Sequence, residues 1–168
     1  ESEGSEVILK LVNFPATRKI SLHLLQQLIL SGGNEEDMKA LLSLLYAPAF
    51  STTRVMNIAS KENLTKASYN VMSNSDRATN DYGSRIEILN AVILCLRESH
   101  RSRTIFRKVG GFVYVVSILM SMEGCLSPEN QILYNRKDEE NVFQLLRSVF
   151  TCLAVAMRYE PANAHFFN

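Results

Sequence analysis

Apolar residues recur along the chain at spacings of three and four, which is the pattern of amphipathic helices and not of alternating strands. This periodicity predicts an all-α chain. The expected helices cover residues 18–31, 85–98, 102–109, 112–122 and 138–159. The run 52–72 is expected to hold one or two less regular helices, and the short run 7–14 fits a helix turn or a strand equally well.

The core positions and ends of these helices follow from the same pattern. Helix 18–31 should end at Gly32-Gly33, and Asn34 is the expected N-cap of a further helix that stops before Pro48. Helix 18–31 is expected to carry its apolar face on Ile20, Leu22, Leu24, Leu25, Leu28 and Ile29. The helix after Asn34 is expected to bury Met38, Leu41, Leu42, Leu44 and Leu45. The expected core of helix 138–159 is Val142, Phe143, Leu145, Leu146, Val149, Phe150, Leu153, Ala154 and Met157.

Two polar stretches interrupt the helical pattern, at residues 73–84 (SNSDRATNDYGS) and 123–136. They are rich in Ser, Asn, Asp, Gly and Pro, which favour turns because they bond to their own backbone or fix unusual dihedrals. Both stretches are therefore expected to be loop insertions. By contrast, Gly110-Gly111 is expected to be a sharp elbow that packs helix 112–122 against helix 85–98.

A polar joint followed by apolar residues occurs twice, after helix 85–98 and after helix 138–159. When Phe106 is aligned with Phe167, Ser102 aligns with Asn163 and His100 with Pro161, an offset of 61 residues. Armadillo and HEAT repeats span about 40–47 residues, and the insertion at 123–136 accounts for the difference. A weaker third copy is expected near 24–46. These features predict one armadillo/HEAT-like helical repeat domain, an α-solenoid over residues 1–168, with repeat boundaries near 50, 99 and 160.

Composition narrows the function without identifying it. The 168 residues are 46% apolar and 21% charged with a net charge of +1, so no overall field attracts nucleic acid or an anionic membrane. Three widely spaced cysteines indicate a reducing compartment and not a disulfide framework. No apolar run reaches the roughly 18–20 residues of a membrane span, and no leader pattern is present. Because the sequence lacks an initial Met, we expect a piece of a longer chain.

Candidate chemistry is sparse. No metal-ligand spacing, nucleophile elbow or phosphate loop is recognisable, so we expect no catalytic residue, cofactor, metal ion or small-molecule substrate. One basic patch stands out, consisting of Arg97, His100, Arg101, Arg103, Arg107 and Lys108. It fits either an anion-binding surface for acidic peptide, phosphoinositide or nucleic acid, or the solvated face of a short helix. We favour the solvated face because acidic residues elsewhere balance the charge.

The joint, the apolar pair, the Gly-Gly elbow and the following apolar helix together resemble an armadillo repeat. The resemblance implies a first helix at 102–109, a second at 112–122 and a third at 138–159, with 85–98 as the third helix of the preceding repeat. Third helices of this family line a concave face that binds other proteins. The chain has no Trp, and Asn90 and Leu94 occupy the Trp and Asn positions, which argues against importin-like capture of a peptide backbone. The candidate protein-interaction residues are Glu87, Asn90, Arg97, Gln144, Arg147 and Arg158.

Residues 85–124, with the phrase IEILNAVILCLRESHRSRTIFRKVGGFVYVVSILMSMEG, also resemble the armadillo-like N-terminal region of large BEACH-domain scaffold proteins. The nearest subgroup carries WD-repeat and FYVE domains. This resemblance implies a non-catalytic, cytoplasmic scaffold in membrane traffic or selective autophagy. Its partners would be other proteins, and it would reach membranes only indirectly, through modules outside these residues. We do not expect nucleic acid to be a partner.

Overall fold

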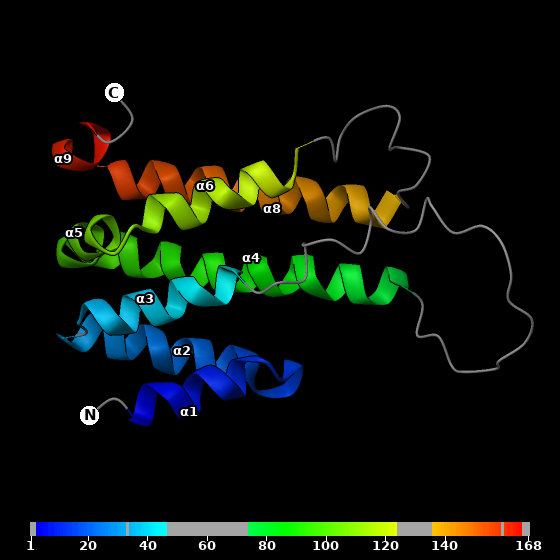
Figure 1. Cartoon of the computed structure of the whole chain (residues 1–168), viewed down its shortest axis with the longest axis horizontal. Helices are drawn as coiled ribbons and strands as arrows, with labels where there is room; N and C mark the ends of the chain where they lie inside the picture. Colours follow the sequence, from blue (N-terminus) through cyan, green and yellow to red (C-terminus); the bar gives the residue numbers. More distant parts are fainter. Residues whose placement is uncertain (1–2, 33, 47–73, 124–135, 159, 166–168) are drawn as a thin grey trace, which may run out of the picture.

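The computed structural model describes residues 3–32, 34–46, 74–123, 136–158 and 160–165, and every regular element within these ranges is a helix (Figure 1). The elements are α1 (Glu3–Val12), α2 (Pro15–Gly32), α3 (Glu35–Ser43), the short 3₁₀ helix η1 (Leu44–Tyr46), α4 (Asn74–Glu98), α5 (His100–Lys108), α6 (Gly111–Ser121), α8 (Arg136–Met157) and α9 (Pro161–Ala164). The expectation of an all-α fold is confirmed, and the ambiguous run 7–14 lies mostly in helix α1.

The helix ends follow ordinary capping chemistry. α2 begins at Pro15, three residues earlier than expected, because proline suits the first helical position, where no backbone N–H is required. Asn34 caps α3 as predicted. Its side-chain oxygen accepts a hydrogen bond from the backbone N–H of Asp37 at 2.9 Å, and the Asp37 carboxylate accepts one from the Asn34 N–H at 3.3 Å. This reciprocal pair is a capping box.

Residues 74–84 form the first turns of α4, so the prediction of a loop at 73–84 is wrong. Turn-favouring side chains cost a helix only about 0.5–1 kcal/mol each relative to alanine. That cost is offset because Tyr82 and Arg85 are buried in the core, with 4% and 5% of their surface exposed. Gly83 lies within the helix without a positive φ. Packing of Tyr82 and Arg85 against distant parts of the chain therefore outweighs the preference of these residues for a turn.

Two sequence predictions fall on residues that the structure does not describe. The less regular helices expected at 52–72 lie there entirely. The expected loop at 123–136 lies there except at its two ends, where Glu123 follows α6 and Arg136 begins α8. Both therefore stay predictions.

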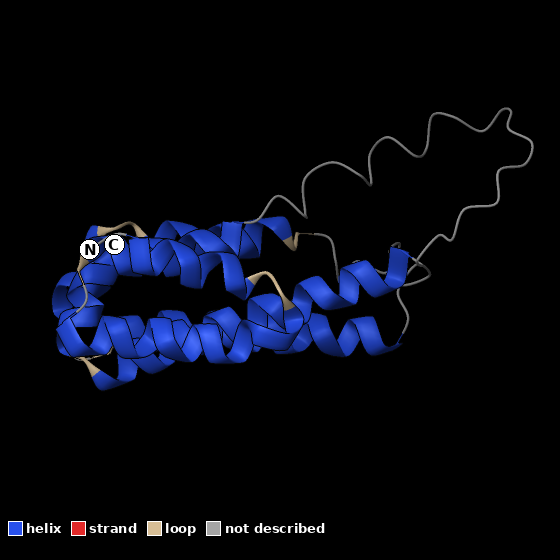
Figure 2. Ribbon diagram, turned by 90° about the horizontal axis from the view of Figure 1, so that it is seen from below, coloured by secondary structure: helices blue, strands red, loops and turns tan. Residues whose placement is uncertain are grey.

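The long helices α2, α4 and α8 run parallel to one another, and α4 packs against both of the others (Figure 1). The short helices α3 and α5 pack together, and α5 also contacts α9. Figure 2 shows the helices arranged in two layers, and in Figure 1 the first and last helices, α1 and α9, lie at opposite ends of the stack. A long helix followed by a short one thus occurs three times in the described residues, which includes the third copy expected near 24–46.

The core is formed by one face of each helix, and several expected core positions lie outside it. Leu25, Met38, Leu89, Phe112 and Leu145 are completely buried. The expected core residues that are exposed instead are Ile20, Leu24 and Leu28 of α2 and Phe143, Phe150 and Ala154 of α8. Apolar residues in α2 and α8 cover more than one face, and these six do not face the described neighbouring helices. The spacing therefore predicted too wide a buried stripe.

The Gly110-Gly111 elbow is present. Gly110 has φ of +77°, in the left-handed region that glycine tolerates, and α5 and α6 meet at a bend of 70°. The bend brings α6 mainly against α8, and not against α4 as expected, because α4 packs chiefly against α8 and α2. Within the described ranges no single helix has the length and apolar character of a membrane span. The bent pair α5–α6 passes that test only when its two helices are joined.

Candidate interaction groove

An open groove of about 340 Å³ lies between the parallel helices α4 and α8. Its lining residues are Asn90, Ile93, Leu94 and Arg97 from α4 and Arg147, Ser148 and Thr151 from α8. Asn90, Leu94 and Arg97 recur at spacings of four and three, so one face of α4 supplies them all. The structure thus brings together three of the predicted interaction residues, namely Asn90, Arg97 and Arg147.

The groove combines an apolar base with two cationic groups. Leu94 is 40% exposed, and most of the lining surface is apolar. Arg97 and Arg147 are exposed, and their guanidinium groups have no hydrogen bond or ion pair with any described residue. None of the described lining residues carries a carboxylate. Such a surface can hold an apolar side chain while its guanidinium groups bind acceptors, since arginine carries five N–H donors.

The other three predicted interaction residues lie outside the groove lining. Glu87 is 3.7 Å from Arg18, an ion pair that links α4 to α2. Gln144 donates a hydrogen bond of 3.4 Å to Glu140, one turn earlier on α8. Arg158 is exposed just beyond the end of α8. Glu87 and Gln144 are therefore partly engaged within the chain, whereas the guanidinium groups of Arg97 and Arg147 are not paired with a described residue.

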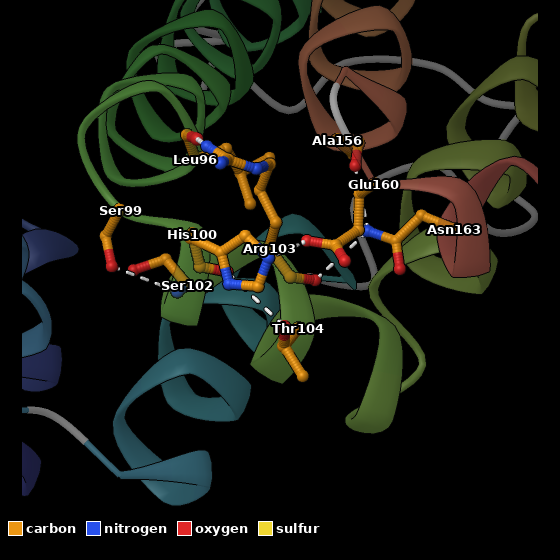
Figure 3. Close-up of polar contacts among 9 residues, drawn as sticks. All are labelled: Leu96, Ser99, His100, Ser102, Arg103, Thr104, Ala156, Glu160 and Asn163. Atoms are coloured by element: carbon orange, nitrogen blue, oxygen red, sulfur yellow. Dashed lines mark hydrogen bonds and ion pairs between the residues drawn. The ribbon is translucent and has the colours of Figure 1, made fainter.

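Similar side-chain hydrogen bonds cap the C-terminal ends of α4 and α8 (Figure 3). Arg103 of α5 donates a hydrogen bond of 2.6 Å to the carbonyl of Leu96, near the end of α4. The side-chain amide of Asn163 in α9 donates a hydrogen bond of 2.8 Å to the carbonyl of Ala156, near the end of α8. It donates a second, of 3.2 Å, to the carbonyl of Arg103. In both cases a side chain seven residues further along satisfies a carbonyl that a helix end leaves free.

The two joints also agree with the offset of 61 residues. Ser99 and Glu160 occupy the N-cap positions of α5 and α9, and the next residue in each case begins the helix. Ser102 and Asn163, which the alignment superimposes, are buried with 2% and 0% exposure. Phe167, the end of the alignment, lies outside the described residues. The sequence repeat is thus matched by equivalent positions in the structure.

The six residues of the basic patch do not form one continuous cationic surface. Arg97 lies in the groove, and the guanidinium of Arg103 is turned to the end of α4. Lys108 Nζ is 3.5 Å from the Glu35 carboxylate, and His100 Nε2 is 2.9 Å from that of Glu160. Arg107 is partly buried and Arg101 is exposed. Several of these groups therefore join α5 to α3, α4 and α9.

Titratable and nucleophilic groups give little sign of chemistry. Among the described residues, no group of three His, Cys, Asp or Glu side chains is placed to hold a metal ion. Burial raises the pKa of the Cys152 thiol to about 12. Burial is also the main cause that raises the pKa of Cys95 to about 12, with a smaller contribution from Glu98. Thiols with such pKa values are protonated at neutral pH and are poor nucleophiles.

Four groove residues were not among the predicted interaction residues: Ile93, Leu94, Ser148 and Thr151. Ile93 and Leu94 sit in a run that is apolar nearly all round and is typical of a core, while Ser and Thr on a helix carry no strong signal. The repeat offset could have found two of them. It places Thr151 on Asn90 and Ser148 on Glu87, so both correspond to candidate residues of the preceding long helix.

Comparison with known protein families identifies the repeats. The model of a family described as armadillo-like repeats matches residues 59–168, which is more than half of the chain. The matched region includes α4, α5, α6, α8 and both joints. No solved structure matches the chain.

Proposed function

The chain belongs to the family of armadillo-like repeat proteins, and we propose from this that it is a non-catalytic segment that binds another protein in the groove between α4 and α8. Repeats of this family typically bind other proteins, and the fold is generally a non-catalytic scaffold. Stacked repeats present extended surfaces because each repeat contacts mainly its neighbours. The parallel packing of α4 and α8 provides such a surface here.

The observation that carries this proposal is the groove itself. It lies between the two long helices that the armadillo resemblance identifies as third helices. Its apolar base is accessible, and Asn90, Arg97 and Arg147 project polar groups that the described part of the chain leaves without partners. Unpaired polar groups around an accessible apolar surface are typical of binding sites.

A quantitative comparison of captured proteins tests this proposal. The tagged chain and the double variant Arg97→Glu/Arg147→Glu would each be incubated with cell extract, and bound proteins would be quantified by mass spectrometry. Arg101→Glu is the matched control, because Arg101 is exposed on α5 outside the groove. We expect specific partners to be retained by the control and lost by the double variant. Equal recovery with all three proteins would refute the groove as the binding surface.

We further propose that the chain is part of a large cytoplasmic scaffold in membrane traffic or selective autophagy. The support is the resemblance of residues 85–124 to BEACH-domain scaffolds of the WD-repeat and FYVE-domain subgroup, which includes the autophagy-linked FYVE protein. Membranes would be reached indirectly, through other modules. The test is the position of the endogenous full-length protein during starvation, with or without a block of autophagosome turnover. An unchanged distribution, never overlapping autophagic or endosomal membranes, would count against this assignment.

Anion binding by the basic patch is the rival function. It requires the cationic groups to act together on one polyanion, whereas Lys108, His100 and Arg103 contact groups within the chain. Titration with single-stranded DNA and with phosphoinositide vesicles separates the two functions. Tight binding that weakens steeply with salt and disappears in Arg101→Glu would favour the rival.

A further inference from the structure

We propose that the groove between α4 and α8 selects an acidic peptide segment, in which an apolar side chain lies between carboxylates. This inference rests on the proposed function and adds the chemistry of the partner. The apolar side chain would contact Leu94 and the edge of Ile93. The carboxylates would meet Arg97 on one helix and Arg147 on the other.

The charge of the groove provides the first argument. Among the described lining residues both charged side chains are arginines, and no described carboxylate pairs with either guanidinium. Elsewhere in the fold, Arg18 faces Glu87 and Lys108 faces Glu35. A guanidinium pairs with a carboxylate through two parallel hydrogen bonds, which gives both strength and orientation. An acidic partner would therefore complete pairs that the described part of the chain leaves open.

The size and composition of the groove provide the second argument. Its volume of about 340 Å³ is at the low end of small-molecule pockets, which span roughly 300–1,000 Å³. An open groove of that size suits one or two side chains. The exposed part of Leu94 gives an apolar contact, while Asn90, Ser148 and Thr151 supply neutral hydrogen-bonding groups along the edges. A purely polar polyanion would leave the apolar base uncovered.

The distribution of charge favours a peptide over nucleic acid. Nucleic acid is usually bound by a continuous basic stripe that contacts many phosphates. Here the remaining residues of the basic patch lie on α5, where Arg103 and Lys108 have partners within the chain. Two arginines on either side of an apolar surface match two separated carboxylates better than a regular row of phosphates.

A selection from a random dodecapeptide library tests the inference on the complete chain. Peptides that bind the wild type would be counter-selected on Thr151→Trp, a neutral change that fills the groove without altering its charge. We expect the groove-dependent peptides to be enriched in Asp and Glu beside Leu, Ile or Phe. The best of them would then be synthesised with a fluorescent label and titrated against each variant.

In these titrations Arg97→Glu and Arg147→Glu should each weaken binding about 5- to 30-fold, as expected for a charged hydrogen bond that is partly exposed to solvent. Arg101→Glu should leave the affinity within about twofold, because exposed charges outside the contact are screened at moderate salt. Replacing Asp and Glu of the peptide by Asn and Gln should produce a loss similar to that of the arginine reversals. Far-UV circular dichroism and melting temperatures would verify that each variant is folded.

Three results would overturn the inference. Groove-dependent peptides without acidic enrichment would refute the partner chemistry and leave the proposed function in place. An absence of any peptide sensitive to Thr151→Trp, together with partner capture unaffected by the groove variants, would refute the proposed function as well. Tighter binding of oligo-dT than of any selected peptide, with loss in Arg97→Glu, would assign the arginines to nucleic acid.

Discussion

Substitution of Gly111 by alanine should destabilise the fold, although alanine is the better helix former. Gly111 is the first residue of α6, and a Cβ atom there would lie 2.6 Å from Cγ of Phe106 and nearer still to its ring edge. Nonbonded carbons rest about 3.5–4.0 Å apart, so the ring would have to move by roughly 1 Å. Phe106 cannot move freely, because it is fully buried and packs edge-on against Phe112, with the two ring centroids 5.1 Å apart.

The size of the effect follows from two opposing contributions. Overpacking a buried site costs about 1–3 kcal/mol, and replacing glycine by alanine in a helix returns at most about 0.5–1 kcal/mol. We expect a net loss of about 1–2 kcal/mol, which for a chain of this size lowers the melting temperature by roughly 2–8 °C. Urea unfolding followed by far-UV circular dichroism measures the free energy directly.

Two further variants isolate the cause. Gly110→Ala adds a Cβ where nothing lies within 4 Å, so its cost of about 1–2 kcal/mol should come from the positive φ alone. Phe106→Leu removes the clashing ring edge, so Gly111→Ala should cost clearly less in that background than in the wild type. A Gly111→Ala protein as stable as the wild type, or an unchanged cost in the Phe106→Leu background, would refute the steric reasoning.

Three other predictions concern the joints, the buried thiols and the outer faces. Asn163→Ala should cost about 1–3 kcal/mol in urea unfolding, because the carbonyls of Ala156 and Arg103 lose a buried donor, and Ala162→Ser, at an exposed neighbour, is the control that should change little. The raised pKa values of Cys95 and Cys152 make the stability of the fold depend on pH. Their contribution is fully present below pH 9.0, the ordinary pKa of a thiol in water, and is lost as the pH rises toward about 12. The loss occurs because the unfolded chain releases these two protons at a lower pH than the folded chain does. In a Cys125→Ser background, urea midpoints across that range would check this, and a flat profile would contradict it. Phe143→Ser changes a side chain that is 59% exposed, so the free energy of unfolding should change by no more than about 0.5 kcal/mol. Leu145→Ala changes a fully buried side chain and should cost about 2–5 kcal/mol. Similar losses at both sites would show that α8 is packed differently.

Local signals predicted the helices and their ends well. Asn34 followed by Asp37 and the Gly110-Gly111 pair each specify a backbone geometry through contacts within a few residues. Such signals do not depend on the rest of the fold. The joint residues Ser102 and Asn163 were found in a different way, because their equivalence is visible in the sequence as a repeat.

The failures share a different cause, which is the packing of distant helices. The polar turns before Arg85 become helical because Tyr82 and Arg85 are buried against the core. Phe143 and Phe150 are exposed because α8 turns another apolar face inward. For the same reason sequence could nominate Arg97 and Arg147 separately but could not show that one groove contains both, since that depends on α4 and α8 lying in parallel contact.

The amide of Asn163 has a consequence for the spacing of the stack. It joins the carbonyl of Ala156, at the end of α8, to that of Arg103, whose own guanidinium holds the end of α4. Hydrogen bonds are short and directional, so this chain of contacts sets the pitch from one repeat to the next at the ends of both long helices. The separation of α4 and α8 determines how far apart Arg97 and Arg147 stand. The joint at Asn163 lies outside the groove, yet it thereby determines how far apart two carboxylates of a bound peptide must be for the groove to recognise both.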